Sequence, residues 1–573
     1  MRIVAVSLNQ KLFDWNRNVD NILCAIDWAY RHDVMVIAFP ELCLTGVGFS
    51  ENFKRQEMLD KSLDVFFKLM PNLKNLITVI GLPVVYEDHV FNAACLVVDG
   101  KPIGFQCKTR FNSLAEYNFF TPWKRDRYVQ IELRGESYKF GDLSFEFNYF
   151  EFAQNNTNNT ANDTAQKDNN KSTTDDKKAN DKNANDKSTD NKNADNKSVN
   201  DKSADDKGGA DKKSDDKRDG STFHVVVEIG EPDWLNPVAP NADGRQKVDL
   251  LFNPASSRFE FGKAAKRIEY AKRVTQNHSY THIFSNYIGN GHGQVVYDGG
   301  SFIAEHGNVL ASTPRFSYHD IQTVVAVTGV DAPYQLLPTM SKEEELMRVV
   351  PFAMLDHLRK TETRGFVLPL NGKIEETAVA VITMLGVCFA WEELGRENFV
   401  REFGFIAKIE NAESPKDAVK EILTCLYQRT HKGYEVAGKR VRDIVQEIGA
   451  EFLEVDIDEI IDGYKTIASN ASGQELSCAK SAAVLEKLVS YVQEPVVKLI
   501  ADIRGKTLLV NATKNDNTNT QNDNKTKDDV PTYSVPVDGV DGVLLRQCLM
   551  WICSNGITIG NERIKCPFLE NIF

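Results

Sequence analysis

The chain has 573 residues, too many for a single hydrophobic core, so at least two domains are expected. Its formal net charge of -13 argues against a surface that holds nucleic acid. No stretch approaches the roughly 20 consecutive apolar residues of a membrane span, and the first ten residues, MRIVAVSLNQ, lack the apolar core of a signal peptide. We therefore expect a cytoplasmic protein with reduced cysteines, no nucleic-acid partner and no membrane attachment.

The first 153 residues alternate short apolar runs with helical patterns. They predict strands at Arg2–Leu8, Val34–Phe39, Leu76–Val85 and Ala93–Val98, and a helix over Asn16–His32. Continuous apolar strands are typical of sheets that are buried on both faces, which indicates an α/β fold.

Residues 154–221 consist almost entirely of Asn, Asp, Lys, Ser, Thr and Ala in imperfect repeats. Such a segment cannot bury apolar surface, so we expect disorder and interpret it as an expanded surface loop rather than a partner-binding segment. A second tract of this kind runs over residues 514–529.

The α/β pattern resumes after this insert. It predicts strands at His224–Ile229, Val248–Phe252, His282–Tyr287 and Ser301–Ala304, and a basic helix over Gly262–Asn277. Two prolines interrupt Asp331–Met340, and a domain boundary is predicted there. Ser341 and Glu344 then form a capping box that begins a helix extending to about Lys360.

The second region, 341–573, again follows βαβ logic. It predicts strands at Phe366–Leu370 and Phe452–Asp456, and helices near Glu376–Leu394 and Asp417–Arg429.

Three segments of the first region follow predicted strands and carry the residues of a candidate site. Glu41 lies in FPELCLTG, Lys108 in GFQCKTRF, and Gly230 in VVVEIGEPDW. These segments resemble nitrilase-type amidases, in which a Glu, a Lys and a Cys meet at strand ends. In that chemistry the thiolate attacks an amide carbonyl, the Glu moves protons and the Lys stabilises the oxyanion.

The segments LFNPASSRFEFGK and STPRFSY extend the resemblance to the amidase domain of eukaryotic-type glutamine-dependent NAD synthetases. The resemblance implies an αββα sandwich over residues 1–330, with Glu41 as general base and Lys108 as the electrostatic group. The residues that it implies for the substrate pocket are Glu116, Tyr117, Ser256 and Ser257. Taken singly, Glu41 is also consistent with a salt-bridging carboxylate, and Lys108 with a solvated lysine.

The nucleophile position departs from the family. The family motif EICE reads Glu228-Ile229-Gly230-Glu231 here, and no cysteine occurs between Cys107 and Cys388. Removing a nucleophile lowers the turnover of proteases about a million-fold. We therefore expect that glutaminase activity is lost.

In the second region, the strand GFVLPL leads into a short loop and an apolar helix. The loop residues are Asn371, Gly372, Lys373, Ile374, Glu375, Glu376 and Thr377. A helix N-terminus after a strand can bind an anion through its free backbone N–H groups. The family reads LPLSGGxDS at this position, the pyrophosphate loop of ATP pyrophosphatases, which implies a Rossmann-like α/β domain over 341–573.

That resemblance also implies ATP and Mg²⁺, with no permanent cofactor, and leaves Glu375 able to bind the metal. The loop departs from the family where Asn371, Lys373 and Glu376 replace Ser, Gly and Ser. The alternative is a capped helix start without a ligand.

Three functions remain open from the sequence. The first is the family reaction, which converts nicotinic acid adenine dinucleotide, ATP and glutamine, or free ammonia, to NAD. The second is a catalytically inactive paralogue that is a scaffold or regulatory subunit of an active synthetase. The third is a protein that binds glutamine or the dinucleotide without turnover. The resemblance also implies a homo-oligomer or an assembly with a related synthetase.

Overall fold

The computed structural model describes residues 1–48, 50–111, 113–148, 222–232, 248–276, 278–291, 295–329, 339–430, 434–474, 482–509, 533–534 and 536–572. The two predicted low-complexity tracts and most of the predicted boundary at residues 331–340 lie outside these residues.

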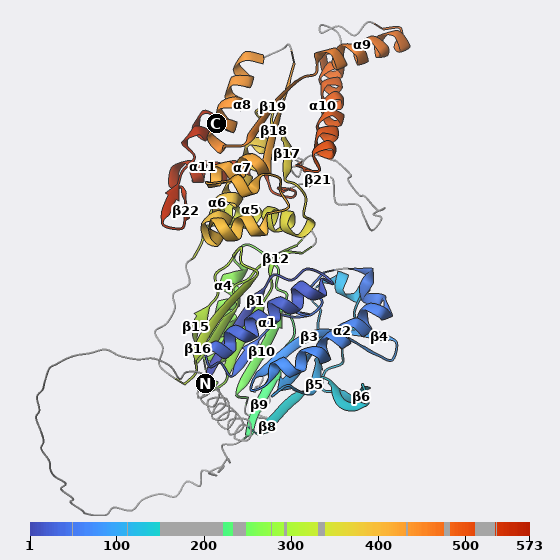
Figure 1. Cartoon of the computed structure of the whole chain (residues 1–573), viewed down its shortest axis with the longest axis vertical. Helices are drawn as coiled ribbons and strands as arrows, with labels where there is room; N and C mark the ends of the chain where they lie inside the picture. The colour runs from blue at the N-terminus through green and yellow to red at the C-terminus, as the bar shows by residue number, and fades with distance from the viewer. Residues whose placement is uncertain are drawn as a thin grey trace, which may run out of the picture. The chain divides into compact units, whose positions relative to one another are not determined.

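Two large sheets and the two-stranded sheet β12-β13 form the N-terminal domain (Figure 1). Its strands are β1 (Arg2–Leu8), β2 (Val36–Ala38), β3 (Ile77–Tyr86), β4 (His89–Val98), β5 (Lys101–Cys107), β6 (Tyr128–Leu133), β7 (Glu136–Gly141), β8 (Ser144–Asn148), β9 (Thr222–Val227), β10 (Leu250–Ala255), β11 (Thr281–Asn286), β12 (Ile288–Gly291), β13 (Val295–Asp298), β14 (Phe302–Glu305), β15 (Asn308–Ser312) and β16 (Ile321–Val327). The first sheet has the order β16-β1-β2-β3-β4-β5-β7-β6, and the second contains β15, β14, β11, β10 and β9 in that order. The sheets face each other, since β1 and β2 pack against β11 and β3 packs against β10.

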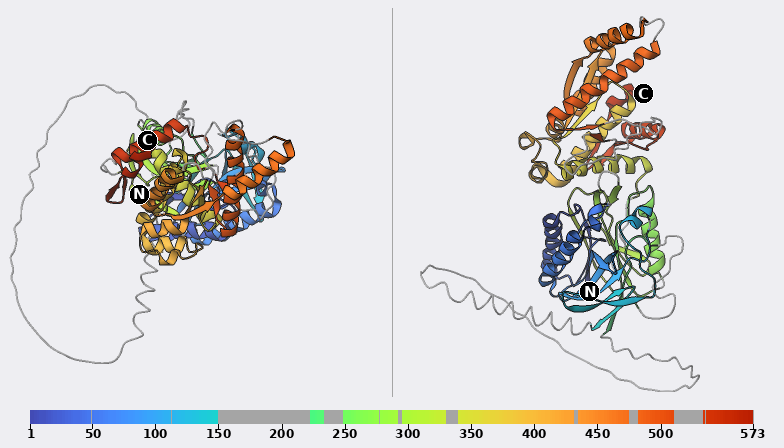
Figure 2. Two further views of the ribbon diagram at one scale, coloured as in Figure 1. Left: turned by 90° about the horizontal axis from the view of Figure 1, so that it is seen from above. Right: turned by 90° about the vertical axis from the view of Figure 1, so that its right-hand side faces the viewer.

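Helices cover the outer faces of the two sheets. Helices α1 (Trp15–Arg31) and α2 (Gln56–Leu69) pack on the first sheet, and α4 (Lys263–Thr275) packs on the second. The right-hand view of Figure 2 shows the blue helices and the green helix on opposite sides of the strands. The αββα sandwich predicted from the sequence is thereby confirmed.

The second domain is built on a parallel sheet with the order β19-β18-β17-β20-β21. Its elements are α5 (Lys342–Thr361), β17 (Phe366–Pro369), α6 (Ile374–Glu402), α7 (Pro415–Ile422), β18 (Leu423–Arg429), α8 (Tyr434–Ile448), β19 (Glu451–Asp456), α9 (Asp458–Ser472), α10 (Ala482–Arg504), β20 (Thr507–Leu509), β21 (Tyr533–Ser534), α11 (Gly542–Asn555), β22 (Ile557–Ile559) and β23 (Glu562–Ile564). Helices α5, α6, α8 and α11 contribute to one large core, whereas α10 packs on β17 and β20 through a separate cluster. The predicted second α/β domain is therefore confirmed, and its helix α5 begins at the predicted cap, where the Ser341 side chain accepts the backbone N–H of Glu344.

One predicted helix is wrong. The sequence pattern indicated a helix over Asp417–Arg429, but the chain forms α7 as far as Ile422 and then the central strand β18. β18 lies between β17 and β19 and is buried along almost its whole length. A strand that is buried on both faces carries a continuous apolar run, which periodicity cannot distinguish from a buried helix.

Helix α6 corrects a second expectation, that no stretch of the chain is long and apolar enough to span a membrane. By length and composition α6 could cross one, but 78% of its most apolar window is buried inside the protein. Its side chains, from Ala378 to Leu394, belong to the core of the second domain. The apolar length of α6 is therefore explained by packing.

Candidate active site

The ends of four strands bring the predicted amidase residues together. Glu41 follows β2, Lys108 directly follows β5, Gly230 follows β9, and Ser256 directly follows β10. β2 and β5 belong to the first sheet, and β9 and β10 to the second. The site therefore lies at the carboxyl ends of strands from both layers of the sandwich.

Glu41 and Lys108 form a buried ion pair, so Lys108 is not the solvated lysine of the alternative interpretation, whereas Glu41 is a salt-bridging carboxylate as that alternative allowed. The Lys108 Nζ atom lies 2.7 Å from Glu41 Oε1 and 2.6 Å from Glu116 Oε2. The Glu41 carboxylate also accepts hydrogen bonds from Asn92 Nδ2 at 2.5 Å and Ser256 Oγ at 2.9 Å. Burial disfavours the charged lysine, but the two carboxylates outweigh burial and raise the pKa of Lys108.

Gly230 lies at the centre of this arrangement. A Cβ atom added there would be 3.1 Å from Lys108 Nζ and 3.7 Å from Glu41 Oε2. A nucleophilic side chain at this position would therefore meet both the proposed base and the proposed cation. The same Cβ would be 2.7 Å from Lys108 Cε, so the lysine occupies space that such a side chain needs.

A second polar array lies beside the first. The Ser257 hydroxyl donates to Glu231 Oε1 at 2.6 Å, and Lys263 Nζ lies 2.6 Å from the same oxygen. Burial opposes ionisation of Glu231, but Lys263 and Ser257 outweigh it and lower the pKa of this carboxyl. Arg267 Nε donates to the Ser257 hydroxyl at 3.0 Å, so Ser257 is held in position from both sides.

A cavity of about 120 Å³ opens onto these groups. Its lining includes Glu41, Lys108, Glu116 and Ser256 of the predicted site, together with Asn92, Glu231, Arg258 and Tyr297. Two predicted pocket residues lie elsewhere. Ser257 is fully buried behind Glu231, and Tyr117 is 55% exposed with its ring against Phe111.

Neighbouring cysteines do not replace the missing nucleophile. Cys43 lies two residues from Glu41, but it is completely buried, and burial raises the pKa of its thiol to about 12. Cys107 precedes Lys108, is equally buried, and has a thiol pKa raised well above its ordinary value. Because the thiolate is the reactive form, both side chains are inert.

The loop between β17 and α6 has the predicted strand–loop–helix geometry. Gly372 has a φ of 95°, the left-handed region that favours glycine. The helix begins at Ile374, with Lys373 as the cap. Glu375 is partly exposed, and the buried Thr377 donates its hydroxyl to the carbonyl of Lys373 at 3.0 Å.

The Glu376 side chain turns back into this loop. Its Oε2 atom accepts the backbone N–H groups of Asn371 and, at 3.4 Å, of Lys373. These are the donors that a phosphate would need at the helix start. Glu376 is only 5% exposed, and burial is the main reason why the pKa of its carboxyl is raised.

This loop does not fit a nucleoside triphosphate with its Mg²⁺ ion. Its N–H donors at Asn371 and Lys373 are already satisfied by a carboxylate, which would repel a phosphate. Among the residues that the structure describes, no group of three or more His, Cys, Asp or Glu side chains could hold a metal ion. Glu375 remains as a single carboxylate in the first turn of α6.

Known proteins are similar to this chain in both sequence and architecture. Residues 2–152 match the carbon-nitrogen hydrolase family. Glutamine-dependent NAD(+) synthetases of Homo sapiens and Saccharomyces cerevisiae are each 21% identical over 532 and 537 residues, which is 82% of this chain. The crystal structure of the glutamine-dependent NAD(+) synthetase from Cytophaga hutchinsonii superposes with a TM-score of 0.73 and 20% identity, covering 97% of this chain and 81% of that one.

The chain is similar in sequence to glutamine-dependent NAD(+) synthetases and has the fold of a solved one. It spans 65% of the length of the human and yeast relatives. The synthetase from Acinetobacter baumannii, solved in complex with ADP, has the same fold, with a TM-score of 0.64 at 14% identity and coverage of 97% of this chain and 83% of that one.

Sequence reasoning missed several residues of the amidase-like site. Asn92, Glu231, Lys263 and Tyr297 line the cavity or support its carboxylates. Asn92 offered a usable signal, because it is a polar residue inside the apolar strand β4. Lys263 begins a basic helix that contains several other lysines and arginines. The sequence does not distinguish it from them, and only the structure shows that it contacts Glu231.

Proposed function

We propose that this chain is a catalytically silent homologue of glutamine-dependent NAD(+) synthetases that serves as a partner subunit of an active synthetase. The observation that carries the proposal is Gly230, which lies where a nucleophile would meet Glu41 and Lys108. In this proposal residues 1–330 derive from the glutamine amidase and residues 341–573 from the synthetase, and the protein resides in the cytoplasm.

The amidase-like cavity keeps everything except the attacking atom. Hydrolysis of glutamine requires a covalent acyl-enzyme or an activated water at the carbonyl carbon. Glu41 keeps its hydrogen-bond partners Lys108, Asn92 and Ser256, but position 230 offers it no nucleophilic side chain to deprotonate. This arrangement supports a pocket that has lost the glutaminase step.

The loop at α6 supports loss of the synthetase step. The family reaction that the resemblance implies consumes ATP together with nicotinic acid adenine dinucleotide. Here the Glu376 carboxylate lies where the phosphates of ATP would accept backbone N–H groups. A negative charge already in place disfavours a second anion at the same donors.

Helices α9 and α10 support an assembly role. None of the residues of α9, all of which the structure describes, is buried. Large apolar side chains are exposed on both helices, namely Ile460, Tyr464, Ile467, Val484, Tyr491, Leu499 and Ile503. Exposed apolar surface of this kind marks protein–protein contacts. The partner that we propose is a chain of the same fold, an active synthetase.

Two assays on the purified chain test the catalytic part. Incubation with glutamine should release no ammonia, and incubation with nicotinic acid adenine dinucleotide, ATP, Mg²⁺ and ammonium should form neither AMP nor NAD. AMP and NAD formed from ammonium would instead establish an ammonia-dependent synthetase and end the proposal.

Association from the native source tests the partner role. Affinity capture of the chain should recover a synthetase subunit with intact motifs, and replacing Tyr491 and Ile503 by Lys should release it. Capture of the chain alone, monomeric by light scattering, would contradict this role.

The intact Glu41–Lys108–Glu116 array favours a second candidate function, ligand binding without turnover. Calorimetric titration with glutamine should then give saturable heat that Glu116→Ala abolishes. A titration without heat would exclude it.

A further inference from the structure

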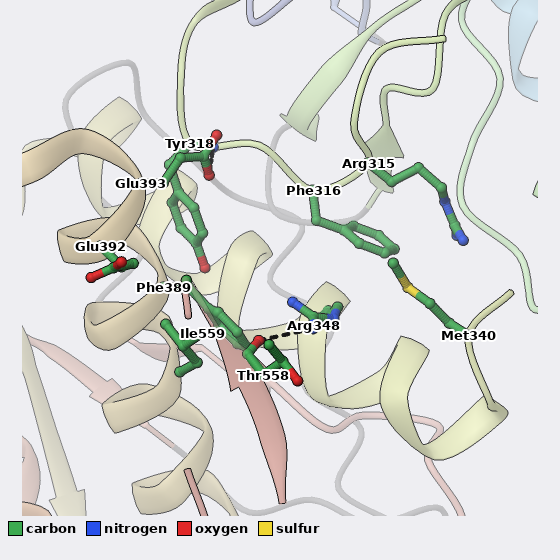
Figure 3. A pocket seen from close by; sticks show the side chains of 11 residues that line it. Arg315, Phe316, Tyr318, Met340, Arg348, Phe389, Glu392, Glu393, Thr558 and Ile559 are labelled. Carbon is green, nitrogen blue, oxygen red and sulfur yellow. Dashed lines mark hydrogen bonds between the residues drawn. The ribbon is translucent and has the colours of Figure 1, made fainter. Parts of the chain in front are cut away.

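A cavity of about 330 Å³ lies where α5, α6 and the β22–β23 hairpin meet the segment between β15 and β16. The residues that line it include Phe316, Tyr318, Arg348, Phe389 and Thr558. Figure 3 shows the Arg348 side chain between those of Phe316 and Phe389, with the Tyr318 hydroxyl directed toward Phe389. This volume is at the lower end of the range of small-molecule sites, roughly 300–1,000 Å³.

The cavity contains a polar group that nothing in the described structure satisfies. The Tyr318 side chain is 2% exposed, yet its hydroxyl has no hydrogen-bond partner. Arg315, also in the lining, has a buried Nη2 atom without a partner. Buried polar groups are nearly always paired, so each unpaired one requires an explanation. A bound molecule with an acceptor atom would supply the missing partner.

The walls of the cavity are formed by aromatic rings and by arginines whose charges are already paired. The Phe316 and Phe389 side chains are 6% and 8% exposed and line the cavity from different elements. Arg315 stacks on Phe316 with 4.6 Å from guanidinium to ring centre, and Arg348 stacks on Phe389 with 5.1 Å. Both arginines also have carboxylate partners, Glu345 for Arg315 and Glu344 for Arg348.

The formal charges of the lining balance. Two arginines, Arg315 and Arg348, stand against two glutamates, Glu392 and Glu393. Glu393 is engaged by the Ser317 hydroxyl and the backbone N–H of Tyr318. The unpaired N–H and O–H donors of the lining require an acceptor atom, and the carboxylates around them disfavour an anion. Burial raises the pKa of Tyr318 well above its usual range, so its hydroxyl stays protonated and can donate.

We propose that this cavity binds a small uncharged aromatic molecule that carries a carbonyl oxygen. The ring would pack against Phe316 and Phe389, and the carbonyl would accept a hydrogen bond from the Tyr318 hydroxyl. Because Arg315, Phe316 and Tyr318 of the N-terminal domain line the cavity together with α5, α6 and β22 of the second domain, the ligand would brace the junction between the two domains. The site shares no residue with the amidase-like cavity or the α6 loop, so it is independent of the proposed function.

Benzamide is the probe that tests this chemistry, titrated into the full chain and followed by ligand-observed NMR. Tyr318→Phe keeps the ring and removes only the unpaired hydroxyl. It should weaken benzamide at least fivefold without lowering the melting temperature, because no existing hydrogen bond is lost. Benzylamine has the ring but, as an ammonium ion at neutral pH, carries a charge and no acceptor, so it should bind at least fivefold more weakly than benzamide.

Tyr297→Phe is the matched control, because it removes a hydroxyl from the amidase-like cavity instead. This variant should bind benzamide like the parent chain. A second variant, Thr558→Trp, should block the cavity from its exposed rim and abolish binding.

Four outcomes would overturn the proposal: no saturable binding of benzamide, equal binding by Tyr318→Phe and the parent, loss of binding only in Tyr297→Phe, or tighter binding of benzylamine than of benzamide.

Discussion

Gly230 leaves the amidase-like site without a nucleophile, and its backbone conformation also limits which residues this position accepts. Its φ of 93° lies in the left-handed region, where a side chain costs about 1–2 kcal/mol. Its carbonyl accepts Asn253 Nδ2 at 2.8 Å, and its N–H donates to the Pro254 carbonyl at 2.8 Å. The backbone is therefore held in a conformation that presents whatever stands at position 230 to Glu41 and Lys108.

The substitution Gly230→Cys tests whether only the nucleophile is missing. We expect ammonia release from glutamine at least tenfold above the parent chain, because the thiol would lie beside a carboxylate base and an ammonium that lowers its pKa. We also expect a loss of about 1–2 kcal/mol in the free energy of unfolding from the positive φ. Enzymatic determination of ammonia and chemical denaturation measure the two effects.

Gly230→Ala is the control, because it brings the same backbone strain and the same contact with Lys108 Cε but no thiol. It should lose similar stability and release no ammonia. If Gly230→Cys is as inactive as Gly230→Ala while iodoacetamide labels its new thiol, the cavity has lost more than its nucleophile.

Residue identity could be predicted here more readily than residue contacts. Glu41, Lys108 and Gly230 stand out because each follows an apolar strand in a recognisable segment. The bonds from Asn92 to Glu41 and from Lys263 to Glu231 join residues 51 and 32 positions apart, so they depend on which strands and helices become neighbours in the fold. Such pairings leave no mark in local periodicity, which is why the sequence could not show them.

The loop that begins α6 shows how an element can keep its shape and lose a ligand site. Glu376 lies in the first turn of α6, where a carboxylate stabilises the helix by accepting free N–H groups. The carboxylate thereby fills the helix start that would otherwise bind a phosphate. The Glu376 carboxylate, which stabilises the start of α6, and a bound phosphate would compete for the same backbone N–H donors.

Glu376→Ser separates these two effects. Removing the carboxylate should lower the free energy of unfolding by about 1 kcal/mol through loss of the cap. It should also free the N–H groups of Asn371 and Lys373, so that inorganic pyrophosphate gives measurable heat in calorimetry where the parent chain gives none.

Glu375→Ser is the matched variant, because it removes the same charge from the same turn and leaves Glu376 in place. It should neither bind pyrophosphate nor lose the cap. Equal binding by both variants would show that net charge, rather than the filled helix start, keeps anions away.

Elements were predictable where periodicity or capping marks them. Ser341 and Glu344 located the start of α5 correctly, and the apolar run after Glu376 located α6. The boundary between α7 and β18 was not predictable, because Ile422 and Leu423 are both buried and apolar across the change from helix to strand. Only pairing of β18 with its two neighbours decides its conformation.

At the scale of the whole molecule, α5 joins the N-terminal domain to the second α/β domain. Its Asp356 is completely buried and accepts Asn9 Nδ2 at 2.6 Å, beyond the end of β1, and the backbone N–H of Asn290 in β12. Arg359 Nη2 and Lys360 Nζ lie 2.7 Å and 2.9 Å from the same carboxylate. One side chain therefore connects three elements, with two buried cations as partners.

Asp356→Asn should lower the free energy of unfolding by about 3–5 kcal/mol at pH 7, since it removes the buried counter-charge of Lys360 and the nearest carboxylate of Arg359, whose next partner, Asp320, is 3.4 Å away. The effect should depend on pH. Burial opposes ionisation of Asp356, but Lys360 and Arg359 outweigh it, so the pKa of this carboxyl is below its ordinary value near 3.8. A carboxyl with a lowered pKa in the folded state contributes stability above its unfolded pKa and loses it as the pH falls.

The difference in unfolding free energy between parent and Asp356→Asn should therefore be largest above about pH 5 and shrink steadily below pH 4, as measured by denaturant titration across that range. Asp33→Asn supplies the comparison, because its ion pair with Arg2 is 3.5 Å long and Asp33 is 90% exposed. That variant should change stability by less than about 1 kcal/mol at every pH, as expected of a surface pair. A difference for Asp356→Asn that is small, or constant with pH, would mean that its carboxylate is not what joins α5 to β1 and β12.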